Sequence, residues 1–240
     1  MGSFMQGFLD NDSYFGRFMT KFGIIIAANI MFVIFSLPFV TIGAGLTALY
    51  HVMFKTLRSG GVVNPFKQFW TGFVTNFRQA TIAWLLFVLF MGFLTVDLQI
   101  CAQAGGAVAN IKFVIYAIGA AVVFLYLYLL PTMAAFEDTL PHLVKNSMYF
   151  LVKKPLKFVV IVFFDIFPLV LTYSDLKDLP LYAFVWVLCG FGLLAMLGAT
   201  LLLPEFRPFL PVVDDDGDFV SGPEEDEDSI MDDLRELDGF

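Results

Sequence analysis

The chain has 240 residues, of which 59% are hydrophobic and 30 are phenylalanine. Soluble domains contain roughly 45–50% apolar residues, so this composition excludes an ordinary soluble fold. The net charge of −8 is uneven, because residues 214–240 carry 13 acidic side chains against one arginine while the remaining body is mildly basic. We therefore expect an integral membrane protein with an acidic tail, and the charge gives no reason to expect a nucleic-acid partner.

The N-terminal segment, residues 1–21, alternates aromatic and polar side chains before the first apolar run. We expect it to lie in the membrane interface as a short amphipathic element. A cleaved signal peptide is not predicted, because charged residues precede the run and no small-residue cleavage site follows it. Residues 22–207 should then form a transmembrane helical domain, and residues 208–240 an acidic cytoplasmic tail.

The first apolar run, residues 22–37, ends at Pro38, which has no N–H to donate and disfavours helix in the residue before it. A second helix should follow, with Thr41 as its N-cap. Small residues early in that helix would let two helices approach closely in lipid. We therefore predict a tight transmembrane hairpin over residues 22–58, with a motif made of Ser36, Pro38, Thr41, Gly43, Gly45 and Tyr50.

Beyond the hairpin, Asn64 and Pro65 favour the start of a helix that carries aromatic side chains at helical spacing. Basic and polar residues lie on its other side, which is typical of a helix in the headgroup plane. The alternative is that the aromatic side chains pack on the transmembrane bundle. They are Phe66, Phe69, Trp70, Phe73 and Phe77.

Further apolar runs cover residues 80–98, 113–135, 158–173 and 181–203, and each approaches the length that crosses a ~30 Å hydrocarbon core. With the hairpin they predict a bundle of six spans. If residues 41–58 cross, 11 basic residues fall on one side and two, Lys112 and Lys177, on the other, so both termini are expected in the cytoplasm. The alternative is five spans and a re-entrant segment, because residues 41–58 are few and include Tyr50 and His51.

Three polar residues are candidates for a site inside the membrane: Asp165, Asn29 and His51. An ionisable group at this depth costs ~2.5–3.5 kcal/mol on insertion scales, so it usually has a function or a partner. Asp165 comes three residues before the helix-breaking Pro168, and a carboxylate beside freed carbonyls could bind a cation or a sugar hydroxyl. The alternative is a protonated or hydrogen-bonded aspartate with a structural role.

Catalytic motifs are missing from the sequence. His51 and His142 have no cysteine or carboxylate cluster at metal-ligand spacing, and there is no nucleophile elbow or phosphate-binding loop. The two cysteines, Cys101 and Cys189, are too few for a disulfide framework or a structural zinc site. We expect no enzymatic activity, no cofactor and no metal.

The acidic tail has two parts. Residues 214–228 are too charged to fold alone, whereas Ser229 could cap a short helix with apolar side chains along one face. Such a helix is too short to be stable by itself, so we expect it to fold on binding a cytoplasmic groove. The alternative is a solvated tail. The partner-binding candidates are Ile230, Met231, Leu234 and Leu237.

Several runs of this sequence resemble the YesL-like family of bacterial membrane proteins. They are S-L-P-F-V-T-I-G-A-G-L-T-A-L-Y at residues 36–50, F-W-T-G-F-V-T-N-F-R-Q-A at 69–80 and L-L-P-T-M-A-A-F-E at 129–137. The resemblance covers roughly residues 4–207 and implies a multi-pass protein of the bacterial cytoplasmic membrane. It also implies genes often placed beside carbohydrate ABC importers, no established activity and no catalytic residues.

Two functions follow as expectations. The first is an accessory membrane protein of a carbohydrate ABC import system, which binds the bilayer and the permease subunits. The second is an independent transporter or channel for a sugar or an ion, which uses the proline-broken helices and Asp165. The scarcity of polar groups at mid-membrane favours the accessory protein.

Overall fold

The computed structural model describes residues 14–59, 63–104, 110–153 and 155–210, and all regular structure in these ranges is helical. The expected all-α fold is therefore confirmed for these ranges. The predictions for residues 1–13 and for the tail, with its candidates Ile230, Met231, Leu234 and Leu237, lie outside the described residues.

The hairpin consists of α2 (Tyr14–Phe35), the 3₁₀ turn η1 (Phe39–Thr41) and α3 (Ile42–Arg58). α2 ends shortly before Pro38, as its sequence predicts. The prediction that Thr41 caps α3 is wrong, because no cap bond forms at this N-cap position. The Thr41 hydroxyl lies instead 2.6 Å from the Phe35 carbonyl oxygen and 2.7 Å from that of Pro38, so it closes the turn between the helices.

α3 is the central helix of the molecule. It packs against α2, α4, α5 and α9, and its side chains Leu49, Val52 and Met53 are completely buried. Helices rather than lipid therefore surround α3. This explains how a helix of 17 residues with polar members such as Thr47 and Thr56 fits into so apolar a protein.

The segment after the hairpin forms one helix, α4 (Pro65–Ala104), of 40 residues. The side chain of Asn64 starts it, because Oδ1 accepts the backbone N–H groups of Phe66 and Lys67 at 3.0 and 3.2 Å. The separate interfacial helix and span that we predicted are thus continuous. At ~1.5 Å per residue α4 is about 60 Å long, roughly twice the hydrocarbon thickness.

The aromatic side chains at the start of α4 divide between the two predicted roles. Phe69 and Phe73 are buried, with ring centroids 5.7 and 5.1 Å from the ring of Phe35 in α2. Phe66 and Phe77 are exposed, as is Trp70, although its ring also lies 5.8 Å from that of Phe35. Some of these aromatic side chains therefore pack α4 against α2, and the others remain on the surface.

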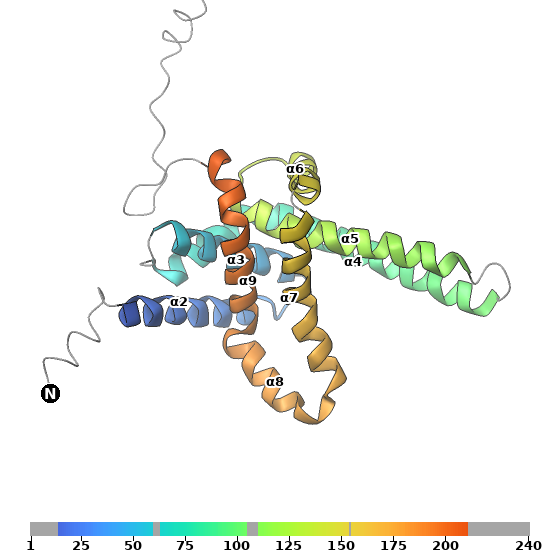
Figure 1. Cartoon of the computed structure of the whole chain (residues 1–240), viewed down its shortest axis with the longest axis horizontal. Coiled ribbons are helices and arrows are strands. Elements are labelled where there is room, and N and C mark those ends of the chain that lie inside the picture. Colours follow the sequence, from blue (N-terminus) through green and yellow to red (C-terminus); the bar gives the residue numbers. More distant parts are fainter. Residues whose placement is uncertain (1–13, 60–62, 105–109, 154, 211–240) are drawn as a thin grey trace, which may run out of the picture.

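α5 (Ile111–Ala135) returns along α4, and the far ends of both helices extend beyond the rest of the molecule (Figure 1). Near the body these helices pack on α3. Farther out, Leu94 and Cys101 of α4 form a small separate core with Ile115 of α5. We call residues 88–104 of α4 and 111–118 of α5 the α4–α5 extension.

The remaining elements are α6 (Leu140–Lys153), α7 (Pro155–Ser174), η3 (Leu176–Asp178), α8 (Leu179–Val185), the π-helical turn η4 (Trp186–Gly190), α9 (Phe191–Phe206) and η5 (Arg207–Phe209). In Figure 1, α7 and α9 run across the direction of α2, α4 and α5. The expectation that Pro168 breaks its helix is wrong, because α7 continues through it to Ser174.

Aromatic packing joins these elements at one end of α9. The ring of Phe206 is completely buried and lies 5.1 Å from that of Phe136, 4.9 Å from that of Phe150 and 5.8 Å from that of Phe54. These rings belong to α9, to the end of α5, to α6 and to α3. An ion pair reinforces the same end, since Lys157 Nζ lies 2.6 Å from Glu205 Oε1.

Four helical segments in the described part of the chain are long and apolar enough to cross a membrane: Phe15–Phe35, Pro65–Gln103, Ile111–Ala135 and Leu179–Phe209. Val159–Ser174 is a shorter apolar helix. The membrane character expected from composition is thus confirmed at the level of four candidate spans. The count of six stays a prediction, and it depends on α3 and α7.

Candidate functional site

Asn29 lies where α2 meets the π-helical turn η4, and it is completely buried. Its Nδ2 donates to the carbonyl oxygens of Trp186 at 3.0 Å and Val187 at 2.7 Å, and its Oδ1 accepts the backbone N–H of Gly192 at 2.8 Å. A π-helical turn shifts the regular bonding pattern and leaves backbone groups in need of partners. The amide of Asn29 supplies those partners, so its polar capacity is used inside the protein.

A glycine allows this contact between α2 and α9. A Cβ on Gly192 would lie 2.9 Å from Ile25 Cγ2 and 3.3 Å from Asn29 Cβ. Small residues permit such close approach between helices in lipid. Gly192 thus brings its own N–H within reach of Asn29.

Asp165 lies on the face of α7 that turns toward α9, and it is half-buried. It lines a cavity of about 150 Å³ with side chains from α3, α5, α7, η4 and α9. Those side chains are Leu46, Tyr50, Leu127, Leu130, Leu169, Trp186, Phe191, Leu194 and Ala195. Asp165 is the only charged side chain among these lining residues, and none of the described residues hydrogen-bonds to it.

A second cavity lies next to this one, between α7, α8 and α9. The second cavity has about 330 Å³ and is lined by residues that include Pro168, Leu181 and Tyr182. Both cavities share Trp186 and Leu194 as lining residues. The indole Nε1 donates to the Thr172 hydroxyl at 2.9 Å, and that hydroxyl donates to the Pro168 carbonyl at 2.8 Å.

Two of the three predicted polar candidates therefore have Trp186 as a common neighbour. Asn29 contacts the backbone of Trp186, and Asp165 shares a cavity with the indole of the same residue. His51 lies elsewhere, on the side of α3 that faces α4 and α5, with Nδ1 3.3 Å from the Ala134 carbonyl oxygen. A Cβ on Gly72 would lie 2.7 Å from His51 Cβ, so the histidine packs directly on α4.

The predicted hairpin motif serves packing. A Cβ on Gly43 would lie 2.6 Å from Trp84 Cβ in α4, and one on Gly45 would lie 3.0 Å from Ser36 Oγ. Tyr50 points toward α9, where a Cβ on Gly198 would lie 2.9 Å from its hydroxyl oxygen. These residues let α3 pack tightly against its neighbours on three sides.

The comparison with protein families adds one result. Residues 25–98 match the family described as "Protein of unknown function, DUF624". The matched range covers the second half of α2, all of α3 and most of α4. Neither the curated proteins nor the solved structures contain a match.

The match supports a family without a known function, and its range includes residues 36–50. It ends before Asp165 and Trp186, so among the residues that line the two cavities beside η4 only Leu46 and Tyr50 lie in the matched range. In the part of the chain that the structure describes, no group of three or more His, Cys, Asp or Glu side chains could hold a metal ion.

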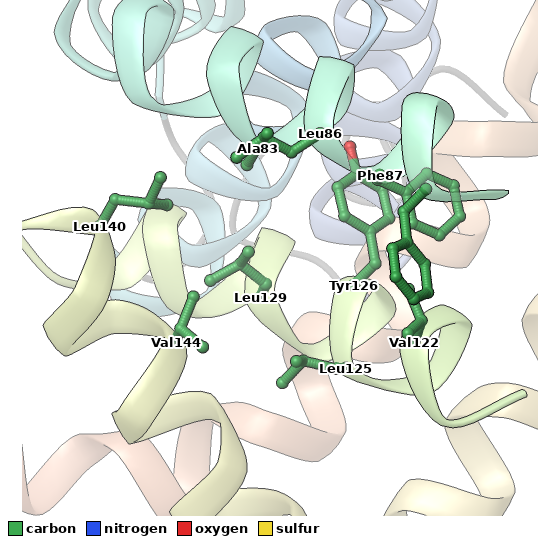
Figure 2. A pocket seen from close by; sticks show the side chains of 10 residues that line it. Ala83, Leu86, Phe87, Val122, Leu125, Tyr126, Leu129, Leu140 and Val144 are labelled. Carbon is green, nitrogen blue, oxygen red and sulfur yellow. The ribbon is translucent and has the colours of Figure 1, made fainter. Parts of the chain in front are cut away.

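A third cavity of about 320 Å³ lies between α4, α5 and α6. Figure 2 shows its side chains, which include Phe87 of α4, Leu125 of α5 and Val144 of α6. The hydroxyl of Tyr126 is the one polar side-chain group among the residues drawn there. Apart from this hydroxyl the cavity offers only apolar contact, so it has no basis for selecting a ligand by charge.

Sequence reasoning missed Trp186 and Thr172, which connect Asn29 to the neighbourhood of Asp165. The π-helical turn that places Trp186 has no local signal, because the run from Leu181 to Leu203 is uniformly apolar. The one available signal was Asn29 in the first apolar run, since an amide at membrane depth needs polar partners elsewhere in the chain.

Proposed function

We propose that this protein is an accessory subunit of a bacterial carbohydrate ABC import system that binds its membrane components through the α4–α5 extension. The observation that carries this proposal is the exposed face of the extension formed by Leu89, Gly92, Phe93 and Val96, which we call the extension face. These residues are three and four positions apart and therefore share one side of α4.

The extension face has the composition of a helix-packing surface. A Cβ on Gly92 would meet no atom within 4 Å, so nothing in the described part of the fold requires a glycine there. In lipid, helices associate through close packing around small residues. A glycine among large apolar side chains suits a helix of a partner protein, whereas lipid alone would tolerate any apolar residue.

Transport by the chain alone has less support. All polar groups of the Asn29 side chain are bonded to the backbone around η4, which leaves Asp165 as the one charged side chain lining the described cavities. A self-sufficient transporter is expected to have several polar groups along its path through the membrane. The resemblance to YesL-like proteins implies a setting beside sugar importers, which agrees with an accessory role.

The proposal includes six spans in the bacterial cytoplasmic membrane, with both termini in the cytoplasm. The charge distribution supports this topology, since it puts 11 basic residues on the cytoplasmic side. The burial of α3 among four other helices supports a crossing by this short segment, because a helix shielded from lipid needs less apolar surface.

Purification from the native host in mild detergent, followed by mass spectrometry, tests the proposal. We expect the permease subunits of a sugar importer to be recovered with the unaltered chain. Gly92→Leu should abolish that recovery while membrane levels stay normal. Gly23→Leu is the matched control, because a Cβ there also meets no atom within 4 Å, but on α2.

Two outcomes would overturn the proposal. One is the absence of importer subunits from the unaltered preparation. The other is equal recovery of importer subunits with Gly92→Leu and Gly23→Leu, which would mean that the extension face contacts only lipid.

A further inference from the structure

Asp165 has no charge partner among the residues that surround it. It is the one charged side chain lining the three cavities described above, and the described lining residues include no lysine, arginine or histidine. An unpaired carboxylate at membrane depth is costly, so a cation that enters the cavity would relieve a penalty that the fold itself leaves in place.

The rest of the lining selects the kind of cation. Tyr50, Trp186 and Phe191 contribute aromatic rings to the Asp165 cavity. Aromatic faces attract ammonium groups, and this attraction is stronger when the contact is desolvated. A strongly hydrated metal ion would need several oxygen ligands, whereas here one carboxylate stands among rings and aliphatic side chains.

The neighbouring cavity provides space for an apolar chain. It has about 330 Å³, is lined mainly by aliphatic side chains such as Leu171, Leu181 and Leu193, and meets the Asp165 cavity at Trp186 and Leu194. A molecule that occupies both cavities would place a charged head beside Asp165 and a hydrocarbon chain in the neighbouring cavity. It would also have to pass or displace the indole of Trp186, which donates to the Thr172 hydroxyl.

We propose that Asp165 binds the ammonium head of a small amphipathic amine whose hydrocarbon chain lies in the cavity between α7, α8 and α9. The carboxylate supplies the charge, the rings of Tyr50, Trp186 and Phe191 surround the head, and the aliphatic cavity holds the chain. This site shares no residue with the extension face, so a test of one proposal does not decide the other.

Isothermal titration calorimetry of the full chain in nanodiscs of zwitterionic lipid tests the proposal, with protein-free nanodiscs as the blank. The two probes are n-octylamine and n-octanol, which have the same chain length and differ in charge. We expect saturable binding of octylamine at least about tenfold tighter than that of octanol, corresponding to one carboxylate–ammonium contact.

Asp165→Asn keeps the shape of the side chain and should abolish the preference for octylamine. Asp97→Asn makes the same chemical change on α4, away from both cavities, and should keep the preference. Equal affinities for the two probes on the unaltered chain would overturn the proposal, and this comparison needs no variant that might fold poorly. An octylamine preference that survives in Asp165→Asn would overturn it as well.

Discussion

At the scale of single residues, Asn29 illustrates how a polar group is accommodated in an apolar protein. Its side chain forms three hydrogen bonds with the backbone around η4, and no part of it is exposed. A satisfied amide of this kind stabilises a particular helix contact, because the same groups would be costly if left unpaired. Asn29 therefore specifies how α2 and α9 dock.

We expect Asn29→Leu to destabilise the protein by about 1–3 kcal/mol, because two carbonyl oxygens and one N–H lose their partner. The measurement is the thermal unfolding midpoint of the detergent-solubilised protein. Asn76→Leu is the matched control, since Asn76 bonds only to the Gly72 carbonyl of its own helix among the described residues, at 3.1 Å. Equal midpoints for the two variants would contradict the role assigned to Asn29.

At the scale of elements, α3 decides the topology. Its start lies beside the middle of α4, where Gly43 approaches Trp84 and the indole of Trp84 donates to the Phe39 carbonyl at 2.8 Å. Its later part lies beside the first half of α4, where His51 meets Gly72. The chain thus reverses direction twice within α2, α3 and α4. Chemical labelling can show on which side of the membrane each of the two turns lies.

We expect cysteines at Val40 and Lys67 to react with an impermeant maleimide from opposite sides of the membrane, because the six-span topology places α3 between them. Both positions are exposed, and the buried Cys101 and Cys189 are replaced by serine beforehand. Reaction in detergent is the control for accessibility. Labelling of both positions from one side would establish α3 as a re-entrant segment.

At the scale of the whole molecule, charge and apolar surface are segregated. The acidic residues concentrate in residues 214–240, outside the described part, while exposed apolar side chains cover the α4–α5 extension and much of α7. Basic side chains such as Lys145 and Lys153 lie on α6, at the end of the bundle where α9 leads toward the tail. An acidic tail and a basic surface close to its origin are complementary.

We expect deletion of residues 214–240 to reduce recovery of the partner proteins without changing membrane levels. Replacing Ile230, Met231, Leu234 and Leu237 by serine keeps every acidic residue and tests whether the apolar face is responsible. Loss of recovery in both variants would support docking of a short helix. Unchanged recovery in the deletion variant would leave the tail without this role.

The sequence by itself determined the features that depend on neighbouring residues. Membrane character follows from composition, the start of α4 follows from Asn64 and Pro65, and the end of α2 follows from Pro38, because caps and prolines act within one helical turn. The same local reasoning failed at Thr41 and Pro168, where the turn geometry and the surrounding helices outweighed the local preference.

Only the tertiary structure decided what the polar residues do. The partners of Asn29 lie between 157 and 163 positions away, so no local pattern relates them. The placement of Asp165 among three aromatic rings likewise requires α3, α7, η4 and α9 to meet. In a chain this apolar, hydrophobic periodicity does not tell a lipid-facing side from a buried one, so the packing of helices had to determine which surfaces α3 buries and which α4 leaves exposed.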